Sequence, residues 1–135
     1  MTDLDDNRLD VARTFGAPHV VNSGGGDPIA AVMALTNGRG VDTAIEAVGI
    51  AATFELCAEI VAPGGVVANI GVHGGKADLH LERLWSRNIT ITTRLVDTSS
   101  TPMLLNAVCA DKVDASRLIT HRFALGDIAE APAHP

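Results

Sequence analysis

The sequence predicts an α/β protein with a doubly wound parallel sheet, and three observations lead to this prediction. Short β-branched runs alternate with segments of helical periodicity along the 135 residues. Residues 66–72 form an almost unbroken apolar run, which is typical of a parallel strand buried on both faces. Gly and Pro residues mark the boundaries between segments, and no repeat or linker divides the chain.

The N-terminal part predicts an amphipathic helix over residues 5–15. Leu9, Ala12 and Phe15 share one face of this helix, and Gly16 can end it. The acid Asp3 stands before the helix, at the end of a short first strand. We therefore expect a β-α order from the first residues onward.

A strand over residues 19–22 and a second helix over 27–37 follow. Residues 19–22 include two consecutive valines, and a glycine-rich turn separates them from the helix. Asp27 and Pro28 open that helix, because an acid suits the N-cap and proline the first turn.

The middle of the chain predicts a strand over 41–48, a helix over 50–61 and a strand over 66–72. Pro63 and the glycines after it are expected to end that helix. Beyond residue 75 the pattern is weaker. The remaining elements expected are a helix over 79–86, a strand over 89–93, a helix over 101–110, a weaker strand or an extended segment over 118–123, and a helix over 127–131.

Composition excludes several classes of function. Hydrophobic residues make up 47% of the chain, the formal net charge is −6, and no cluster of Lys and Arg is present, so a nucleic-acid surface is not expected. Cys57 and Cys109 both fall in apolar stretches and are expected to be buried free thiols. No apolar run is long enough for a membrane span, and no signal peptide is recognisable. We therefore expect a cytoplasmic protein without membrane contact.

The sequence contains no phosphate-binding or catalytic motif that acts alone. GxGxxG, a P-loop, HExxH and GxSxG are all absent. His73 follows the strand over 66–72 and could meet a ligand, although a loop or surface histidine is the favoured alternative. In parallel sheets, ligands bind beyond the carboxyl ends of the strands. The residues to consider there are Asp3, Asn22 with Ser23, 47–49, 70–73 and 92–94.

Several blocks, in this order, resemble zinc-containing medium-chain alcohol dehydrogenases. The blocks are DLDDNRL, ARTFGA, GRGVDTAIEAVG, PGGVVANIGVHG, NITITTRLVDTSSTPMLL and LITHRFALGDIAEA. The resemblance is to the C-terminal part of their NAD-binding domain, and it implies a Rossmann-type sheet. It divides the chain into a partial dinucleotide-binding domain, residues 1–131, and a divergent tail, residues 132–135.

The resemblance implies which residues bind the coenzyme. Asp3 matches the acid that binds the adenosine ribose and so favours NAD over NADP, and Arg8 matches a basic residue near that ribose. Residues 47–49 match the strand end that the coenzyme passes in the family. Residues 70–72 match backbone that approaches the nicotinamide carboxamide, and residues 92–93 match the strand segment that closes over the nicotinamide. The implied cofactor-binding residues are Asp3, Arg8, Ala47, Val48, Gly49, Ile70, Gly71, Val72, Thr92 and Thr93.

The resemblance also implies parts that this sequence does not contain. The glycine-rich phosphate loop, the first strand of the sheet and the family's zinc ligands have no match here, so neither catalytic nor metal-binding residues are assigned. The resulting expectation is a fragment of a zinc-dependent, NAD-linked alcohol dehydrogenase that oxidises an alcohol to an aldehyde or ketone, inactive as an isolated chain. The strand from Ile89 to Thr93 is expected to join copies into a homo-oligomer.

Two alternatives stay open. One is a non-catalytic remnant that forms oligomers or binds nucleotides weakly. The other is a zinc-free relative similar to quinone reductases, which the same blocks also resemble.

Overall fold

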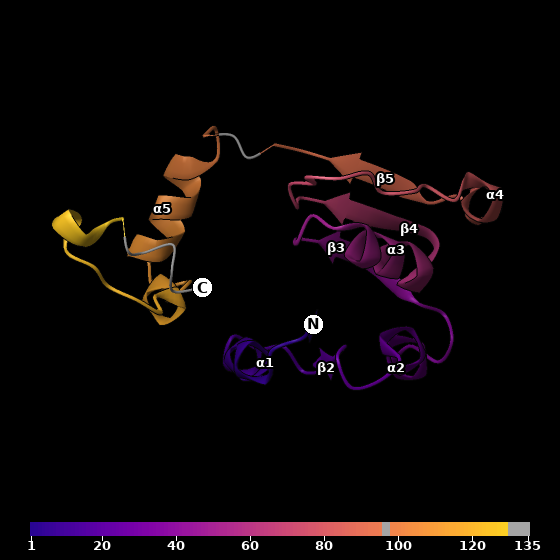
Figure 1. The fold of residues 1–135 in the computed structure, drawn as a ribbon, viewed down its shortest axis with the longest axis horizontal. Coiled ribbons are helices and arrows are strands. Elements are labelled where there is room, and N and C mark those ends of the chain that lie inside the picture. Colours follow the sequence, from indigo (N-terminus) through magenta and orange to yellow (C-terminus); the bar gives the residue numbers. More distant parts are fainter. Residues whose placement is uncertain (96–97, 130–135) are drawn as a thin grey trace. The chain divides into compact units, whose positions relative to one another are not determined.

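The computed structural model describes residues 1–95 and 98–129, and the chain divides into two compact units after residue 96. The first unit contains every strand of the described residues (Figure 1). Its elements are β1 (Thr2–Asp3), α1 (Asp6–Thr14), β2 (Val21–Asn22), α2 (Pro28–Leu35), β3 (Val41–Glu46), α3 (Ala51–Ile60), β4 (Val61–Asn69), α4 (Leu81–Leu84), the 3-10 turn η1 (Trp85–Arg87) and β5 (Thr90–Thr93). The second unit contains α5 (Thr101–Cys109) and the 3-10 turns η2 (Ala115–Leu118) and η3 (Leu125–Asp127).

The strands form two parallel sheets. β1 pairs with β2, and a second sheet has the order β3-β4-β5. Thr2 lies opposite Val21 in the first sheet, and Ala44 opposite Val67 in the second. The alternation of strands and helices and the parallel pairing confirm the predicted fold class.

An open groove separates the two sheets. Within the described residues, β1 and β3 each have a strand partner on one side only. The groove has a volume of about 290 Å³, and residues from both sheets and from α2 line it. Its walls include Thr2, Val21, Val32, Leu35 and Val41. The groove lies where the expected first strand would complete a single sheet.

Two helices, α1 and α2, begin where the sequence predicts, because their first turns are capped by side chains. Asp27 Oδ1 accepts hydrogen bonds from the N–H groups of Ile29 and Ala30, at 2.9 and 3.1 Å, and Pro28 occupies the first turn of α2. Asp5 caps α1 in the same way, through the N–H of Asn7 at 2.8 Å. Local capping therefore fixes both boundaries.

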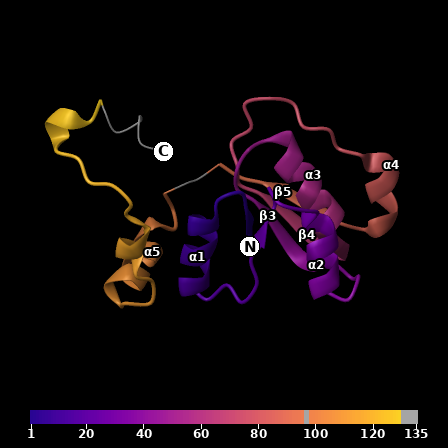
Figure 2. The ribbon, with the colours of Figure 1, turned by 60° about the horizontal axis from the view of Figure 1, so that its bottom comes forward.

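The core lies between α3 and the three-stranded sheet. α3 packs against β3 and β4 and also contacts α2 (Figure 2). The buried cluster consists of Val32, Ala44, Phe54, Cys57, Ile60, Val61 and Val67. These side chains come from both helices and both strands, so burial of their apolar surface holds the layers together.

The C-terminus of α3 is held by an arginine. Arg87 donates hydrogen bonds to the carbonyl oxygens of Ala58 at 2.9 Å, Glu59 at 3.4 Å, and Val61. These carbonyls belong to the end of α3 and the start of β4, where a helix leaves oxygens without intrahelical donors. A cation at this end of a helix also interacts favourably with its dipole.

Several expectations are wrong. Of the two alternatives for residues 118–123, the strand is not formed. β4 begins at Val61 instead of residue 66, with Pro63 inside it and a register shift opposite 41–43. In the strand expected to be buried on both faces, Val66 and Ala68 are only half-buried, and Ile70 and Val72 lie beyond the end of β4 and are exposed. Phe15 is also exposed.

Two further outcomes concern the C-terminal part. Cys57 is buried as expected, but Cys109 is exposed because no residue of α5 is buried. The helix expected over 127–131 is only the 3-10 turn Leu125–Asp127 in the described residues, and the divergent tail 132–135 lies outside them. No helix in the described part is long and apolar enough to cross a membrane.

Candidate coenzyme site

The carboxyl end of β3 is organised around one buried carboxylate. The side chain of Glu46 has no exposed surface. Its Oε1 accepts hydrogen bonds from the N–H groups of Val48 at 2.9 Å and Gly49 at 2.8 Å, and from the Thr53 hydroxyl at 2.6 Å. One oxygen therefore fixes the turn after β3 and ties it to the first helical turn of α3.

The carboxyl end of β4 lies directly against this turn. The N–H groups of Ile70 and Gly71 donate to the backbone oxygen of Glu46, at 2.8 and 3.1 Å. A Cβ on Gly71 would lie 2.8 Å from Gly49 Cα and closer still to Glu46 Oε2. Gly49 has φ +89° and would clash in the same way with the backbone of Val72. Only glycine at both positions permits this approach.

The environment of Glu46 keeps it ionised. Burial by itself raises the pKa of the carboxyl, but the hydrogen bonds from Thr53, Gly49 and Val48, together with the nearby His73, outweigh it and lower the pKa. On α3, burial and then the charge of Glu46 raise the pKa of the Cys57 thiol to about 11. The site therefore holds a carboxylate beside a neutral thiol.

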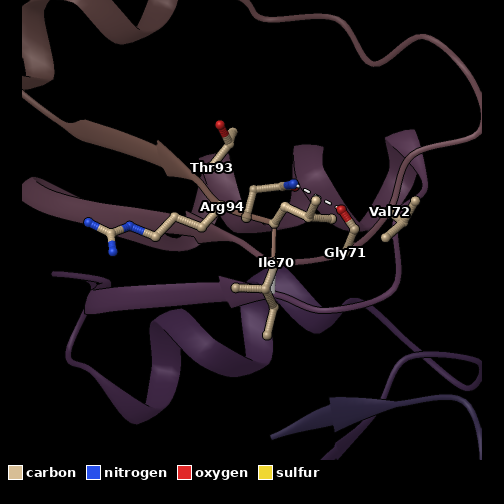
Figure 3. Close-up of a pocket in the computed structure, with 7 residues that line it drawn as sticks. Ile70, Gly71, Val72, Thr93 and Arg94 are labelled. Carbon is tan, nitrogen blue, oxygen red and sulfur yellow. Dashed lines mark hydrogen bonds between the residues drawn. The ribbon is translucent and has the colours of Figure 1, made fainter. Parts of the chain in front are cut away.

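His73 and Asn69 complete the polar cluster. His73 Nε2 lies 2.8 Å from Asn69 Oδ1 and 3.4 Å from Glu46 Oε2. The amide of Asn69 donates to the backbone oxygen of Gly71 at 3.2 Å (Figure 3). The ring of Phe54 stands edge-on to the His73 ring, with centroids 6.2 Å apart.

A pocket of about 270 Å³ opens at the carboxyl ends of β4 and β5. Its lining residues are Asn69, Ile70, Gly71, Val72, Thr93, Arg94 and Leu95. The side chains of Ile70, Thr93 and Arg94 point in different directions around this pocket (Figure 3). A pocket in this place is where an open parallel sheet binds ligands.

The family described as zinc-binding dehydrogenase matches residues 1–108. The chain belongs to this family. An alcohol dehydrogenase of Cupriavidus necator is 37% identical over 133 residues, which cover 96% of this chain and 36% of that protein. A protein named NADP-dependent isopropanol dehydrogenase, from Clostridium beijerinckii, is 34% identical over 84% of this chain and 34% of that protein.

Solved structures agree with this assignment. Zinc-dependent alcohol dehydrogenase 2 from Streptococcus pneumonia has a TM-score of 0.93 and 51% identity, over 98% of this chain and 39% of that one. The alcohol dehydrogenase TADH from Thermus sp. ATN1 has a TM-score of 0.91 and 27% identity. The resemblance inferred from the sequence blocks is thus confirmed, and the chain spans somewhat more than a third of the length of these relatives.

The structure brings most of the expected coenzyme residues of this chain together. Residues 47–49 and 70–72 form the two turns in contact, and Thr93 lies in the wall of the pocket. Thr92 is on the same strand but outside the lining. Asp3 ends β1, half-buried, and its Oδ1 accepts a hydrogen bond from the N–H of Asp5 at 3.0 Å. Arg8 is exposed on α1.

The described residues do not fit a zinc ion. Within residues 1–95 and 98–129, no group of three or more His, Cys, Asp or Glu side chains lies close enough to hold a metal. Glu46 has its carboxylate engaged by three donors, and Cys57 beside it is the neutral thiol described above. The residues that the structure describes therefore offer no zinc site.

Sequence reasoning missed Glu46 and Asn69. Both are buried polar residues at the carboxyl ends of neighbouring strands. A signal for Glu46 was present, because Ala44 and Glu46 share one face of a strand by alternation and that face also points to the core. A charged residue at such an inward position indicates a hydrogen-bonded role.

Proposed function

We propose that this chain is the coenzyme-binding part of an NAD-linked, zinc-dependent alcohol dehydrogenase. The whole enzyme would oxidise an alcohol to an aldehyde or ketone by transferring hydride to NAD. The observation that carries the proposal is the pocket at the ends of β4 and β5, lined by Ile70, Gly71, Val72 and Thr93 beside a glycine turn. This is the geometry that a flat, polar ring with a carboxamide requires: backbone groups within reach and no Cβ in the way.

NAD supplies the hydride acceptor when it is bound, and the residues of this chain fit two ends of the molecule. The turns 47–49 and 70–72 would contact the nicotinamide half. Asp3, at the end of β1, would accept hydrogen bonds from the adenosine ribose through the carboxylate oxygen that does not bind Asp5.

The proposal includes a preference for NAD over NADP. An acid beside the ribose repels a 2′-phosphate, which favours NAD. Some relatives are named as NADP-dependent, so coenzyme choice differs within the family. Asp3 is the residue on which we base the preference for this chain.

The test is isothermal titration of the chain with NAD, NADP and ADP-ribose. We expect NAD to bind at least tenfold more tightly than NADP, and Asp3→Asn to weaken NAD by roughly 10- to 100-fold, the value of a hydrogen bond to a charged group. Asp10→Asn removes the same charge from the exposed face of α1 and serves as the control. If neither NAD nor ADP-ribose binds, the proposal is wrong for this chain.

A second candidate, a non-catalytic remnant, is favoured by one observation. The groove between β1 and β3 leaves two sheet edges without partners in the described residues. A remnant would bind the coenzyme weakly or not at all in the same titration, whereas micromolar binding of NAD favours the coenzyme-binding part of a dehydrogenase. In either case we propose that the isolated chain does not turn over alcohols, and that the free edge of β5 joins copies into a homo-oligomer.

A further inference from the structure

Two buried polar side chains, Glu46 and Asn69, and the partly buried His73 connect the two turns of the coenzyme site. Glu46 ends β3, Asn69 ends β4, and His73 follows β4 by a few residues. Glu46 Oε2 and His73 Nδ1 are buried and have no hydrogen-bond partner in the described residues. Unpartnered buried polar atoms cost stability, so burial alone does not explain why polar residues occupy these positions.

The hydrogen bonds within the cluster have a fixed direction. The Asn69 amide nitrogen donates to the Gly71 oxygen, so the Asn69 oxygen faces His73 and needs a donor. His73 Nε2 must therefore carry a proton, and it directs that proton to Asn69 at 2.8 Å. The ring of Phe54 stands edge-on beside the His73 ring.

Both backbone polar groups of Gly71, which belong to two successive peptide groups in the pocket wall, are held by residues at the ends of β3 and β4. The N–H of Gly71 donates to the backbone oxygen of Glu46, and its C=O accepts from Asn69. The position of the Gly71 oxygen thus depends on Asn69, whose own orientation depends on His73. Figure 3 shows the bond from Asn69 to the Gly71 oxygen beside the lining residues.

We propose that Glu46, Asn69 and His73 are positioning residues, which hold residues 70–72 against the turn 47–49 and thereby set where the nicotinamide end of the coenzyme binds. The identity of the ligand rests on the proposed function, whereas the coupling of the two turns rests on the contacts above. The residues act through the backbone and touch no reacting atom.

The test compares two substitutions of similar size at one position. His73→Gln keeps a side-chain N–H that can donate to Asn69, whereas His73→Met cannot donate. We expect His73→Met to weaken NAD binding about tenfold while ADP-ribose, which lacks nicotinamide, binds as before. His73→Gln should restore most of the NAD affinity. His80→Leu, in a separate segment, is the control.

A merely structural role would give a different result. Loss of stability would weaken the binding of NAD and of ADP-ribose by the same factor. An unchanged ratio of the two affinities therefore overturns the proposal. If His73→Met does not fold, Asn69→Asp replaces it, because a carboxylate cannot donate to the Gly71 oxygen.

A second readout needs no coenzyme. In amide NMR spectra, the signals of Gly49 and Gly71 should shift in His73→Met and return toward their original positions in His73→Gln. Unmoved signals contradict the positioning role. If the unmodified chain binds neither NAD nor ADP-ribose, the proposed function fails, and these spectra still decide whether the three residues couple the two turns.

Discussion

Gly71→Ala is the substitution to which the contact between the two turns is most sensitive. The added Cβ would lie 2.8 Å from Gly49 Cα and closer to Gly49 N and Glu46 Oε2, whereas real Cβ atoms essentially never approach within 3.0 Å. Glu46 Oε2 is the end of a side chain, but this side chain is not free to move away, because its other oxygen is held by three donors. The other two atoms are backbone.

The magnitude follows from these contacts. Overpacking a filled site costs about 1–3 kcal/mol, and moving the turn weakens at least one hydrogen bond of about 1 kcal/mol. We expect Gly71→Ala to lower the free energy of unfolding by about 3 kcal/mol. With a urea dependence of roughly 1–3 kcal/mol per molar for small proteins, the midpoint should fall by roughly 1–3 M.

The assay is urea denaturation followed by circular dichroism, with Gly74→Ala as the matched control. A Cβ at Gly74 meets nothing within 4 Å, and its φ is not in the left-handed region. This control should be neutral or stabilising by up to about 1 kcal/mol, because alanine restricts the unfolded chain. If the two variants unfold within about 0.5 kcal/mol of each other, the reasoning from the close contact is refuted.

Three further predictions concern other features. Cys57 should react with a thiol reagent near pH 8 about 100-fold more slowly than an ordinary thiol, because burial raises the pKa of its thiol to about 11. The exposed Cys109 should react at once, and equal rates for the two cysteines would contradict the burial of Cys57. Arg87→Ala should lower the free energy of unfolding measured in urea by about 1–3 kcal/mol, because the carbonyl oxygens at the end of α3 and the start of β4 lose the hydrogen bonds from Arg87. Arg83→Ala removes only an exposed ion pair and should lower the free energy of unfolding clearly less. Because the folded pKa of Glu46 lies below its ordinary value near 4.5, its stabilisation is present above that pH and is lost as the pH falls through the folded pKa. Glu46→Gln should therefore flatten the loss of stability below about pH 4.5, and parallel curves would contradict this.

Local signals made much of the fold predictable. The caps at Asp27 and Pro28, and the alternation of β-branched runs with helical segments, depend only on neighbouring residues. The strand over 118–123 was wrong for a related reason. A run of mixed polar and apolar residues specifies a strand only where a partner edge is available, and none is present beside it in the described second unit.

The start of β4 also depends on tertiary context. Pro63 and Gly64 read locally as a stop between helix and strand, but the pairing of Val41 with Val61 extends the ladder past them through an irregularity. The cluster of Glu46, Asn69 and His73 could not be predicted from neighbouring residues for a different reason. Its members are distant in sequence, and only the parallel pairing of β3 with β4 brings Glu46 next to His73.

The groove between β1 and β3 has a consequence for the behaviour of the molecule in concentrated solution. Free strand edges beside an apolar surface can add a strand from another chain, so each molecule presents a template to its neighbours. A net charge of −6 opposes such encounters by repulsion over about 10 Å at an ionic strength of 0.1 M. The balance between dispersed and associated molecules is therefore set by the salt in the medium, with added salt removing the protection that the acidic surface provides.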